Sequence, residues 1–485
     1  MGCKVQSDLL KKLIIRGVKT SYGDEVNLKN VNSKTDFTKN VPLSDYEKLQ
    51  PYIQKMMAGE SDVLWPGKVS WYAKSSGTTA DRSKYLPITD EFMINNLTAG
   101  SWDASTIIYR NRPDFRGFEG KSLTLCGALS AMDNYENIKV GDVSAIMLTR
   151  MPNVGKPFFA ALDHALLPNW DMKIRLMSQE AIHEDVVLFG GVPTWAVVLF
   201  DTILQQTGKS NMLEVWPDVK VYLHGGVGFD PYRKLFNQYF PTNDFDYIEV
   251  YNATEGCFAI QDTKEDGMLL LLNNDIYYEF IPVSELESSN PICLSLDEVE
   301  VGKHYAIVIT TSAGLWRYMP GDTIKFVTLH PYRIKVTGRV KHFINVFGEE
   351  VIVSNTDQAI KLTCEQFGCM ANEYTVGPRW LESNKRGGHE WYIEFDSPPH
   401  DLKSFALKLD STLQKLNSDY EAKRYKNMAL DCLQIKCMPK GTFIKWFQSR
   451  GKLGGQHKLP RLYNTRKYLD EIDIILHKEW VSVGD

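Results

Sequence analysis

The alternation of apolar and polar residues divides the chain into helical and strand-like segments. Residues 44–59 predict a helix, because apolar side chains recur at helical spacing, Ser44 suits the N-cap and Gly59 suits the end. Residues 186–204 predict a strand, a glycine turn and a helix that starts at Pro193. Further apolar, strand-like runs follow at 219–224, 247–251 and 304–311. Strands that alternate with helices predict the α/β fold class.

The pattern changes after residue 340. Two amphipathic helical patterns, at about 354–367 and 401–417, alternate with short strand-like pieces such as WYIEF and LQIKC. This pattern of helical and strand-like segments predicts a smaller α+β domain. We expect an N-terminal domain over residues 1–338, a C-terminal domain over residues 339–485 and a hinge near 338–341.

Composition narrows the class of protein. The chain has 485 residues, 43% hydrophobic and 24% charged, with a net charge of -5, so nucleic acid and acidic membrane surfaces are not expected partners. No apolar run approaches the roughly 18 residues of a membrane span, and the N-terminus lacks a signal-peptide pattern. We expect a cytoplasmic protein whose eight cysteines are reduced and do not form a zinc site.

The stretch WYAKSSGTTADRSKYLP, residues 71–87, concentrates hydroxyls, a glycine and three cations in one short loop after a strand-like run. Glycine lets the backbone approach an anion, hydroxyls can donate hydrogen bonds to it, and a lysine adds charge. The loop is therefore a candidate phosphate site, although it is not a Walker motif and a solvated polar turn explains it equally well. The candidate ligands are Ser75, Ser76, Gly77, Thr78, Thr79 and Lys84.

Two clusters at the ends of later strands could bind a nucleotide. In HGGVGFDPY, Gly225 and Gly226 could lie along a flat purine, although a simple tight turn is the better reading of this piece alone. In YNATEG, Tyr251 could stack on a purine, Thr254 could bond a phosphate and Glu255 could hold Mg²⁺. The alternative is a solvated helix cap, but α/β proteins bind ligands where parallel strands end.

Two further clusters lie later in the chain. In WRYMPGDTIKF a proline-glycine turn presents Asp322, whose carboxylate could accept both hydroxyl protons of a ribose, although aspartate is common in turns. In TGRVKHFINVFGEEV, Arg339 and Lys341 lie in the expected joint between domains. A solvated basic linker is the alternative for this pair.

Taken in order, SSGTT, YNATE, YMPGD and GRVKHFINVFGEEV resemble the carboxylate-adenylating superfamily of acyl-CoA synthetases, adenylation domains and luciferases. More closely, PYIQKMMAGE and the tail SRGKLGGQHKLPRL are similar to the Gretchen Hagen 3 family, the auxin-responsive acyl-acid amido synthetases, and its shorter bacterial relatives. The resemblance covers nearly the whole chain. One such motif is weak evidence, but five in the same order are hard to obtain by chance.

The resemblance implies roles for individual residues. Lys458 would contact the reacting carboxylate and the α-phosphate, with Lys452 as the rival candidate, and Lys341 would lie near the hinge. Glu255 would bind Mg²⁺. The residues implied to bind ATP or AMP are Ser75, Ser76, Gly77, Thr78, Thr79, Lys84, Gly225, Gly226, Tyr251, Thr254, Asp322 and Arg339.

The chain departs from the superfamily pattern in its first loop. Asp81 stands where glycine is usual, and Ser83 stands where proline is often found. A carboxylate close to a triphosphate is unfavourable unless it points away or meets a metal ion, so Asp81 puts the exact loop shape in question. Asn345 occupies a position that often carries lysine in acyl-CoA synthetases.

The resemblance implies an ATP-dependent acyl-acid amido synthetase with a large adenylate-forming domain of mixed sheets and helices and a smaller mobile C-terminal domain. Such an enzyme uses ATP and Mg²⁺ to adenylate a small carboxylic acid and passes the acyl group to an amino acid. An acyl-CoA synthetase is the nearest alternative, and a nucleotide-binding module without turnover is another. The sequence does not identify the acid, but residues 98–170, including Trp102, are expected to form part of its pocket wall.

Overall fold

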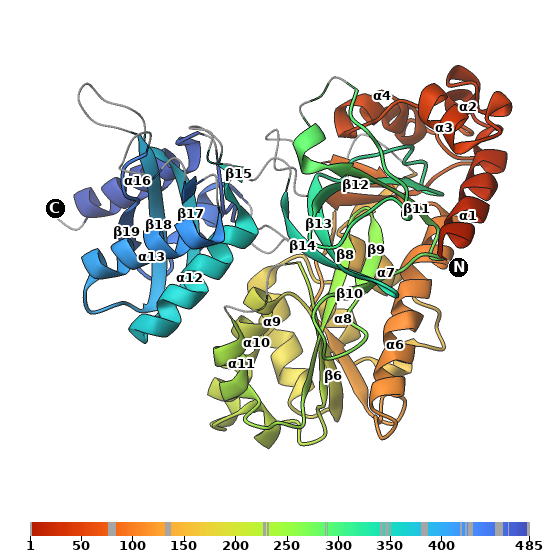
Figure 1. Ribbon diagram of the computed structural model, residues 1–485. Coiled ribbons are helices and arrows are strands. Elements are labelled where there is room, and N and C mark those ends of the chain that lie inside the picture. Colours follow the sequence, from red (N-terminus) through yellow and green to blue (C-terminus); the bar gives the residue numbers. More distant parts are fainter. Residues whose placement is uncertain are drawn as a thin grey trace. The chain divides into compact units, whose positions relative to one another are not determined.

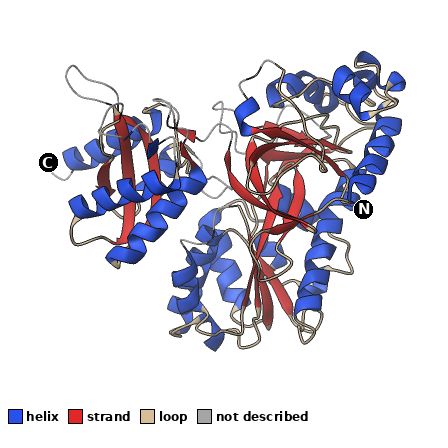
Figure 2. Ribbon diagram, viewed as in Figure 1, coloured by secondary structure: helices blue, strands red, loops and turns tan. Residues whose placement is uncertain are grey.

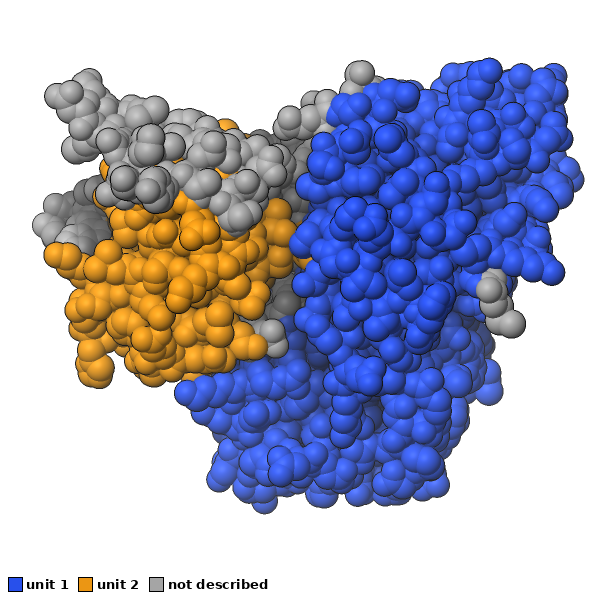
Figure 3. All heavy atoms as spheres, viewed as in Figure 1, with its two compact units in different colours: residues 1–336, 454–456 blue, residues 337–453, 457–485 orange. Residues whose placement is uncertain are grey.

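The computed structural model contains α-helices and β-sheets in two compact units, so the predicted α/β class is confirmed. It describes residues 2–75, 84–130, 137–226, 229, 232–286, 288, 290–339, 343–344, 349, 351–379, 387–417, 420–421, 424, 430–451, 459–463 and 465–482. The side chains of residues 75, 194, 339, 343 and 477–482 are outside this description. The first unit extends to Val336 and the second begins at Thr337 (Figure 3).

The first unit combines helices with two sheets (Figure 1). Its α-helices are α1 (Gly2–Gly17), α2 (Ser21–Glu25), α3 (Lys34–Asn40), α4 (Tyr46–Met57), α5 (Asp90–Phe92), α6 (Ala99–Asn111), α7 (Val143–Thr149), α8 (Leu162–Ala165), α9 (Trp170–Ala181), α10 (Pro193–Thr207) and α11 (Arg233–Tyr239). A π-helix, η2 (Met93–Thr98), joins α5 to α6.

The strands of the first unit form a four-stranded sheet in the order β2-β1-β5-β4 and a ten-stranded sheet in the order β11-β12-β13-β14-β10-β9-β8-β7-β6-β3. Their bounds are β1 (Trp71–Ser75), β2 (Lys84–Pro87), β3 (Lys121–Thr124), β4 (Leu129–Ser130), β5 (Lys139–Gly141), β6 (Val186–Gly190), β7 (Val221–His224), β8 (Asp246–Ala253), β9 (Gly256–Ile260), β10 (Met268–Leu270), β11 (Ile276–Pro282), β12 (His304–Thr311), β13 (Asp322–Leu329) and β14 (Tyr332–Arg339).

Four strands of the large sheet, β3, β6, β7 and β8, are parallel, and β8 then turns back into antiparallel β9. Helices α9, α10 and α11 lie on one side of these strands and α6 on the other (Figure 1). Phe189 and Tyr222 pack in the core on the α10 side, whereas Val187 and Val221 pack in the core on the α6 side. Because both faces are covered, the parallel strands read as continuous apolar runs.

Local pattern predicted several elements well. The strand, turn and helix expected over 186–204 are β6 and α10, with Pro193 in the first turn. The helix expected over 44–59 is α4, but the prediction of its N-cap was wrong. Asp45 accepts the capping bond from Lys48 N, while the Ser44 hydroxyl is buried and donates to Trp316 O at 2.7 Å. Tertiary contact therefore overrides the local capping preference of Ser44.

The second unit is a three-stranded sheet, in the order β17-β18-β19, with helices on both faces (Figure 2). Trp391 and Ile393 pack against α12 and α13, and the intervening Tyr392 packs against α15 and α16, as strand alternation requires. Its elements are β15 (Phe343–Ile344), β16 (Val351–Ile352), α12 (Val353–Phe367), β17 (Met370–Arg379), β18 (Gly388–Ser397), α13 (Leu402–Leu416), β19 (Gln434–Met438), α15 (Thr442–Ser449) and α16 (Lys467–Ser482).

None of the described helices combines the length and apolar composition that crossing a bilayer requires.

Candidate functional site

The carboxyl ends of the parallel strands β7 and β8 form the centre of the candidate site. After β7 the chain passes directly against β8, since a Cβ atom on Gly225 would lie 2.3 Å from Val250 O. Gly226 has a φ of 82°, which favours glycine. Both predicted glycines are therefore needed for the backbone to follow this path, at the edge of the sheet where α/β folds bind ligands.

Two predicted residues from distant motifs meet at this edge. The Tyr251 hydroxyl on β8 donates a hydrogen bond to Asp322 Oδ2, at the start of β13, over 2.6 Å. One face of the Tyr251 ring stacks on Phe258 with 4.6 Å between centroids, so a purine would have to lie on the other face. The tyrosine thus orients the carboxylate that the sequence assigns to the ribose.

The turn between β8 and β9 carries Thr254 and Glu255, and it is fixed from outside the hairpin. Asn96, which is fully buried in η2, accepts a hydrogen bond from Cys257 N at 2.8 Å and donates to Cys257 O and Asn274 O at 3.1 and 2.7 Å. Glu255 is buried, and its negative charge adds to the effect of burial in raising the pKa of Tyr318 well above its ordinary value. Sequence reasoning missed Asn96, although an asparagine among Phe92, Met93 and Leu97 was a usable signal.

The turn that presents Asp322 is held by a buried ion pair. The Arg317 guanidinium donates to both carboxylate oxygens of Glu279, from Nε at 2.9 Å and from Nη2 at 3.1 Å. Its remaining nitrogen donates to the carbonyls of Thr38 and Val41. Arg317 is 4% exposed and Glu279 is 1% exposed, so both charges are removed from water. No local pattern in the sequence predicts this pairing.

The predicted phosphate loop connects two antiparallel strands. Ser75 at the end of β1 pairs with Lys84 at the start of β2, and the Lys84 ammonium lies 5.6 Å from the centre of the Tyr46 ring. Ser76, Gly77, Thr78 and Thr79, together with Asp81 and Ser83, lie outside the described residues. The phosphate role of this loop stays a prediction.

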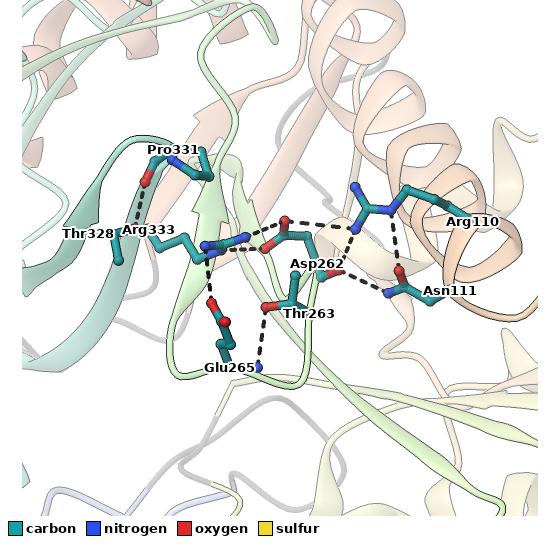
Figure 4. Close-up of polar contacts among 8 residues, drawn as sticks. All are labelled: Arg110, Asn111, Asp262, Thr263, Glu265, Thr328, Pro331 and Arg333. Carbon is teal, nitrogen blue, oxygen red and sulfur yellow. Dashed lines mark hydrogen bonds and ion pairs between the residues drawn. The ribbon is translucent and has the colours of Figure 1, made fainter.

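Strand β14 leads toward the predicted hinge, and an ion pair holds the start of this strand. Arg333 donates to both carboxylate oxygens of Asp262, at 2.8 and 3.0 Å, while Arg110 and Asn111 of α6 donate to the Asp262 carbonyl (Figure 4). The backbone of Arg339 ends β14. Lys341, Lys452 and Lys458 lie outside the described residues, so their roles also stay predictions.

His224, the last residue of β7, is a buried polar residue beside the candidate site that sequence reasoning passed over. It is 3% exposed, and its ring stacks on Phe229 with centroids 4.1 Å apart. Burial, helped by the charge of Arg233, lowers its pKa to about 3, so the imidazole is neutral. Among the described residues, neither ring nitrogen has a hydrogen-bond partner. A histidine ending the apolar run VKVYLH was the available signal.

The described residues could bind a magnesium ion only together with ligands from the substrate. No three His, Cys, Asp or Glu side chains in the described part of the chain converge as a metal cluster. Mg²⁺ is commonly held by one or two carboxylates together with substrate phosphates, so a single buried carboxylate such as Glu255 is compatible with it.

The residues expected to wall the acid pocket lie in different surroundings. Trp102 is 58% exposed on α6, so it is not part of the core, and its place in the pocket wall stays a prediction. Met147 packs on the core of the first unit, and Phe158 packs edge-on against Phe118.

Comparison with protein families gives three consecutive matches. The GH3 family N-terminal domain matches residues 2–167 and 127–245, the GH3 family central domain matches residues 269–339, and the GH3 family C-terminal domain matches residues 354–467. The matches leave few residues of the chain outside them.

Curated relatives align over almost the full chain. The 4-substituted benzoates-glutamate ligase GH3.12 of Arabidopsis thaliana is 23% identical over 99% of this chain and 96% of its own length. The jasmonoyl-L-amino acid synthetase JAR4 of Nicotiana attenuata is 23% identical over 94% of this chain and 90% of its own. Both lie in the range where fold is shared but substrates need not be.

Solved structures share the fold. A GH3.15 acyl acid amido synthetase superimposes with a TM-score of 0.79, at 19% identity, over 97% of this chain and 93% of its own. A 2-hydroxyisobutyryl-CoA ligase in the postadenylation state superimposes with a TM-score of 0.62, at 13% identity, over 98% of this chain and 91% of its own.

Proposed function

This chain belongs to the GH3 family, and we propose that it is an ATP-dependent acyl acid amido synthetase, an enzyme that adenylates a small carboxylic acid and transfers the acyl group to an amino acid. The observation that carries the proposal is the ordered match to all three GH3 domains. Relatives with this arrangement are a benzoate-glutamate ligase and jasmonoyl-amino acid synthetases.

The chemistry explains why ATP is needed. A free carboxylate is a poor acyl donor, because its leaving group would be oxide. An oxygen of the acid attacks the α-phosphate and pyrophosphate leaves; the amine then attacks the acyl carbon and AMP leaves. In this scheme Asp322, oriented by Tyr251, accepts hydrogen bonds from the ribose hydroxyls.

The phosphates would be held at the other side of the nucleotide. Ser75 to Thr79 and Lys84 would supply donors and charge, Thr254 would add a hydroxyl, and Glu255 would hold Mg²⁺, which would offset negative charge at the α-phosphate. The Asn96 contacts that fix the β8–β9 turn keep Glu255 in place for this.

The second unit supplies the remaining catalytic group. Lys458 contacts the reacting carboxylate and α-phosphate, Arg339 reaches the ribose, and rotation near residues 338–341 around Lys341 brings the C-terminal domain in for adenylation and withdraws it for amide formation. The enzyme works in the cytoplasm, which the eight free thiols support.

Acid-dependent pyrophosphate release tests the proposal. Indole-3-acetate, jasmonate and a benzoate such as 4-hydroxybenzoate are offered with ATP and Mg²⁺, and products are analysed by mass spectrometry with amino acids or CoA as acceptor. The expected product is an acyl-amino acid amide. An acyl-CoA without amide would identify an acyl-CoA synthetase instead, and no release with any acid would leave only nucleotide binding.

Two lysine variants separate turnover from binding. Lys458→Ala should abolish pyrophosphate release while ATP binding, measured by calorimetry, changes little. Lys452→Ala is the matched control and should keep most of the release. The reverse result would assign the role to Lys452.

A further inference from the structure

His224 is a buried polar side chain without the partners that burial normally requires. Polar groups removed from water are almost always hydrogen-bonded, because an unmatched donor or acceptor is destabilising. Both imidazole nitrogens are buried and have no partner among the described residues. Among the described residues, the N–H donor and the acceptor of this imidazole are therefore unused at the carboxyl end of β7.

The surroundings of His224 indicate the kind of molecule that could use them. Phe229 lies parallel to the imidazole at 4.1 Å, and the Tyr222 ring lies at 5.4 Å. Arg233 sits over Phe229 and the neighbouring Tyr247, with 4.6 Å to each ring centre. Aromatic walls, a neutral polar group and a nearby positive charge suit a small organic acid, which has an apolar body and electron-rich oxygens.

The nucleotide makes its expected contacts elsewhere. Its ribose is assigned to Asp322, its base to Tyr251 and to the backbone of Gly225 and Gly226, and none of these roles needs an imidazole. His224 lies one residue before those glycines, on the face of the sheet that packs against α10 and α11. The unused donor and acceptor are thus left to the other substrate of adenylation.

We propose that His224 is a specificity-determining residue that hydrogen-bonds a polar atom of the acyl acid. The inference rests on the proposed function and adds to it a residue outside the motifs that identified the family. Because burial lowers its pKa, the imidazole stays neutral and selects by hydrogen bonding and not by charge, and it is a weak base.

The test compares His224→Phe, which keeps the ring contact with Phe229 but removes both nitrogens, with His224→Gln, which keeps a donor and an acceptor. His183→Phe is the matched control, since it makes the same change at an exposed histidine outside this cluster. For each protein, KM values for ATP and for indole-3-acetate, jasmonate and 4-hydroxybenzoate are measured by pyrophosphate release. Melting temperatures are measured with and without each acid.

In His224→Phe, the KM of the acid should rise roughly tenfold, the effect of one lost hydrogen bond, while the KM of ATP changes less than about twofold. The melting temperature without acid should stay equal or rise, because a buried unmatched group is gone, and the shift induced by acid should shrink. His224→Gln should recover part of the acid affinity or change the preferred acid, and His183→Phe should match the wild type.

Other outcomes overturn the inference. An unchanged acid KM in an active His224→Phe enzyme rejects it and leaves the proposed function intact. A raised KM for ATP alone would make His224 a nucleotide contact. If the wild-type protein releases no pyrophosphate with these three acids or with a wider panel of aromatic and aliphatic carboxylic acids, the proposed function and this inference fail together.

Discussion

The two acidic side chains of the site are held by turns of different physical character. The turn with Glu255 is fixed by a neutral amide, Asn96, through three hydrogen bonds to backbone. The turn with Asp322 depends on a buried ion pair, Arg317 with Glu279. One support is a single uncharged side chain, and the other needs two complementary charges.

The difference predicts different responses to damage. A buried ion pair adds little net stability when complete, but it is costly to break, because the remaining charge stays buried. Removal of a neutral amide leaves its former backbone partners without a hydrogen bond, and this destabilises the fold less than an unpaired buried charge does. Loss of the support of the Asp322 turn should therefore mainly lower the stability of the first unit. Loss of the support of the Glu255 turn should mainly lower the catalytic activity.

The largest effect should come from Arg317→Ala. Loss of the guanidinium leaves Glu279 buried without a counter-charge, so the free energy of unfolding should fall by about 3–5 kcal/mol. Urea denaturation followed by circular dichroism measures this. Arg116→Ala, which removes an arginine exposed over 46% of its side chain, is the control and should leave the midpoint unchanged. Equal losses in both variants would contradict the comparison.

Asn96→Ala should come next. It leaves a buried N–H and two carbonyls of the β8–β9 and 272–275 segments without their partner, at a cost of about 2–3 kcal/mol. Because the Glu255 turn loosens, acid-dependent pyrophosphate release should fall by more than the stability loss explains at temperatures where the variant is folded. Asn95→Ala, at the exposed neighbour, provides the baseline. A stable Asn96→Ala enzyme with full activity would show that the β8–β9 turn does not depend on the hydrogen bonds of Asn96.

A smaller, pH-dependent effect is expected beside Asn274, which Asn96 contacts. Burial, helped by the charge of Glu91, raises the pKa of Asp275 to about 7 although Ser312 donates a hydrogen bond to it. The folded state thus holds a proton that the unfolded state releases near pH 4, so this group lowers stability as pH rises from about 4 to about 7.

Asp275→Asn removes that penalty and keeps a residue that tolerates the positive φ of 63° at this position. Relative to wild type, the variant should gain about 1–2 kcal/mol in unfolding free energy between pH 5 and pH 8. Thermal denaturation at the two pH values measures it. Exposed Asp266→Asn should show no such trend, and a gain that is the same at both pH values would refute the titration.

The smallest effect is expected from Tyr251→Phe. The substitution removes one hydrogen bond to Asp322 but leaves the ring on Phe258, so stability should change by about 1 kcal/mol. The KM for ATP should rise about fivefold, because the Asp322 carboxylate, which we propose binds the ribose, would lose its orienting donor. The KM for the acid serves as the internal control. A rise in both KM values would mean that Tyr251 shapes the whole site.

Local elements were predictable because their signals lie within a few residues. The β6–α10 unit follows from an apolar run, two glycines and Pro193, all contiguous. The N-cap of α4 was misassigned because the Ser44 hydroxyl is engaged by Trp316, 272 residues away. A capping preference is a local quantity, and a distant carbonyl can override it.

The candidate site likewise combines features that have a local sequence signal with features that do not. Motifs made Tyr251, Glu255 and Asp322 candidate site residues, since the spacing of polar residues after strands is visible in a sequence. The hydrogen bond between Tyr251 and Asp322 spans 71 residues, and Asn96 acts on Cys257 from 161 residues away. Pairings of this kind come from the topology of the sheet, and a single sequence has no signal for them.

The π-helix that carries Asn96 has a consequence for the history of the family. A π-turn arises when one residue is added to an α-helix, and it persists where it serves a site. Deleting one residue from Met93–Thr98 would restore α-helical winding and turn the following side chains by about 100°. A relative whose helix is α-helical at this point should therefore show a one-residue gap in its alignment with this chain, and it would need another support for the same turn.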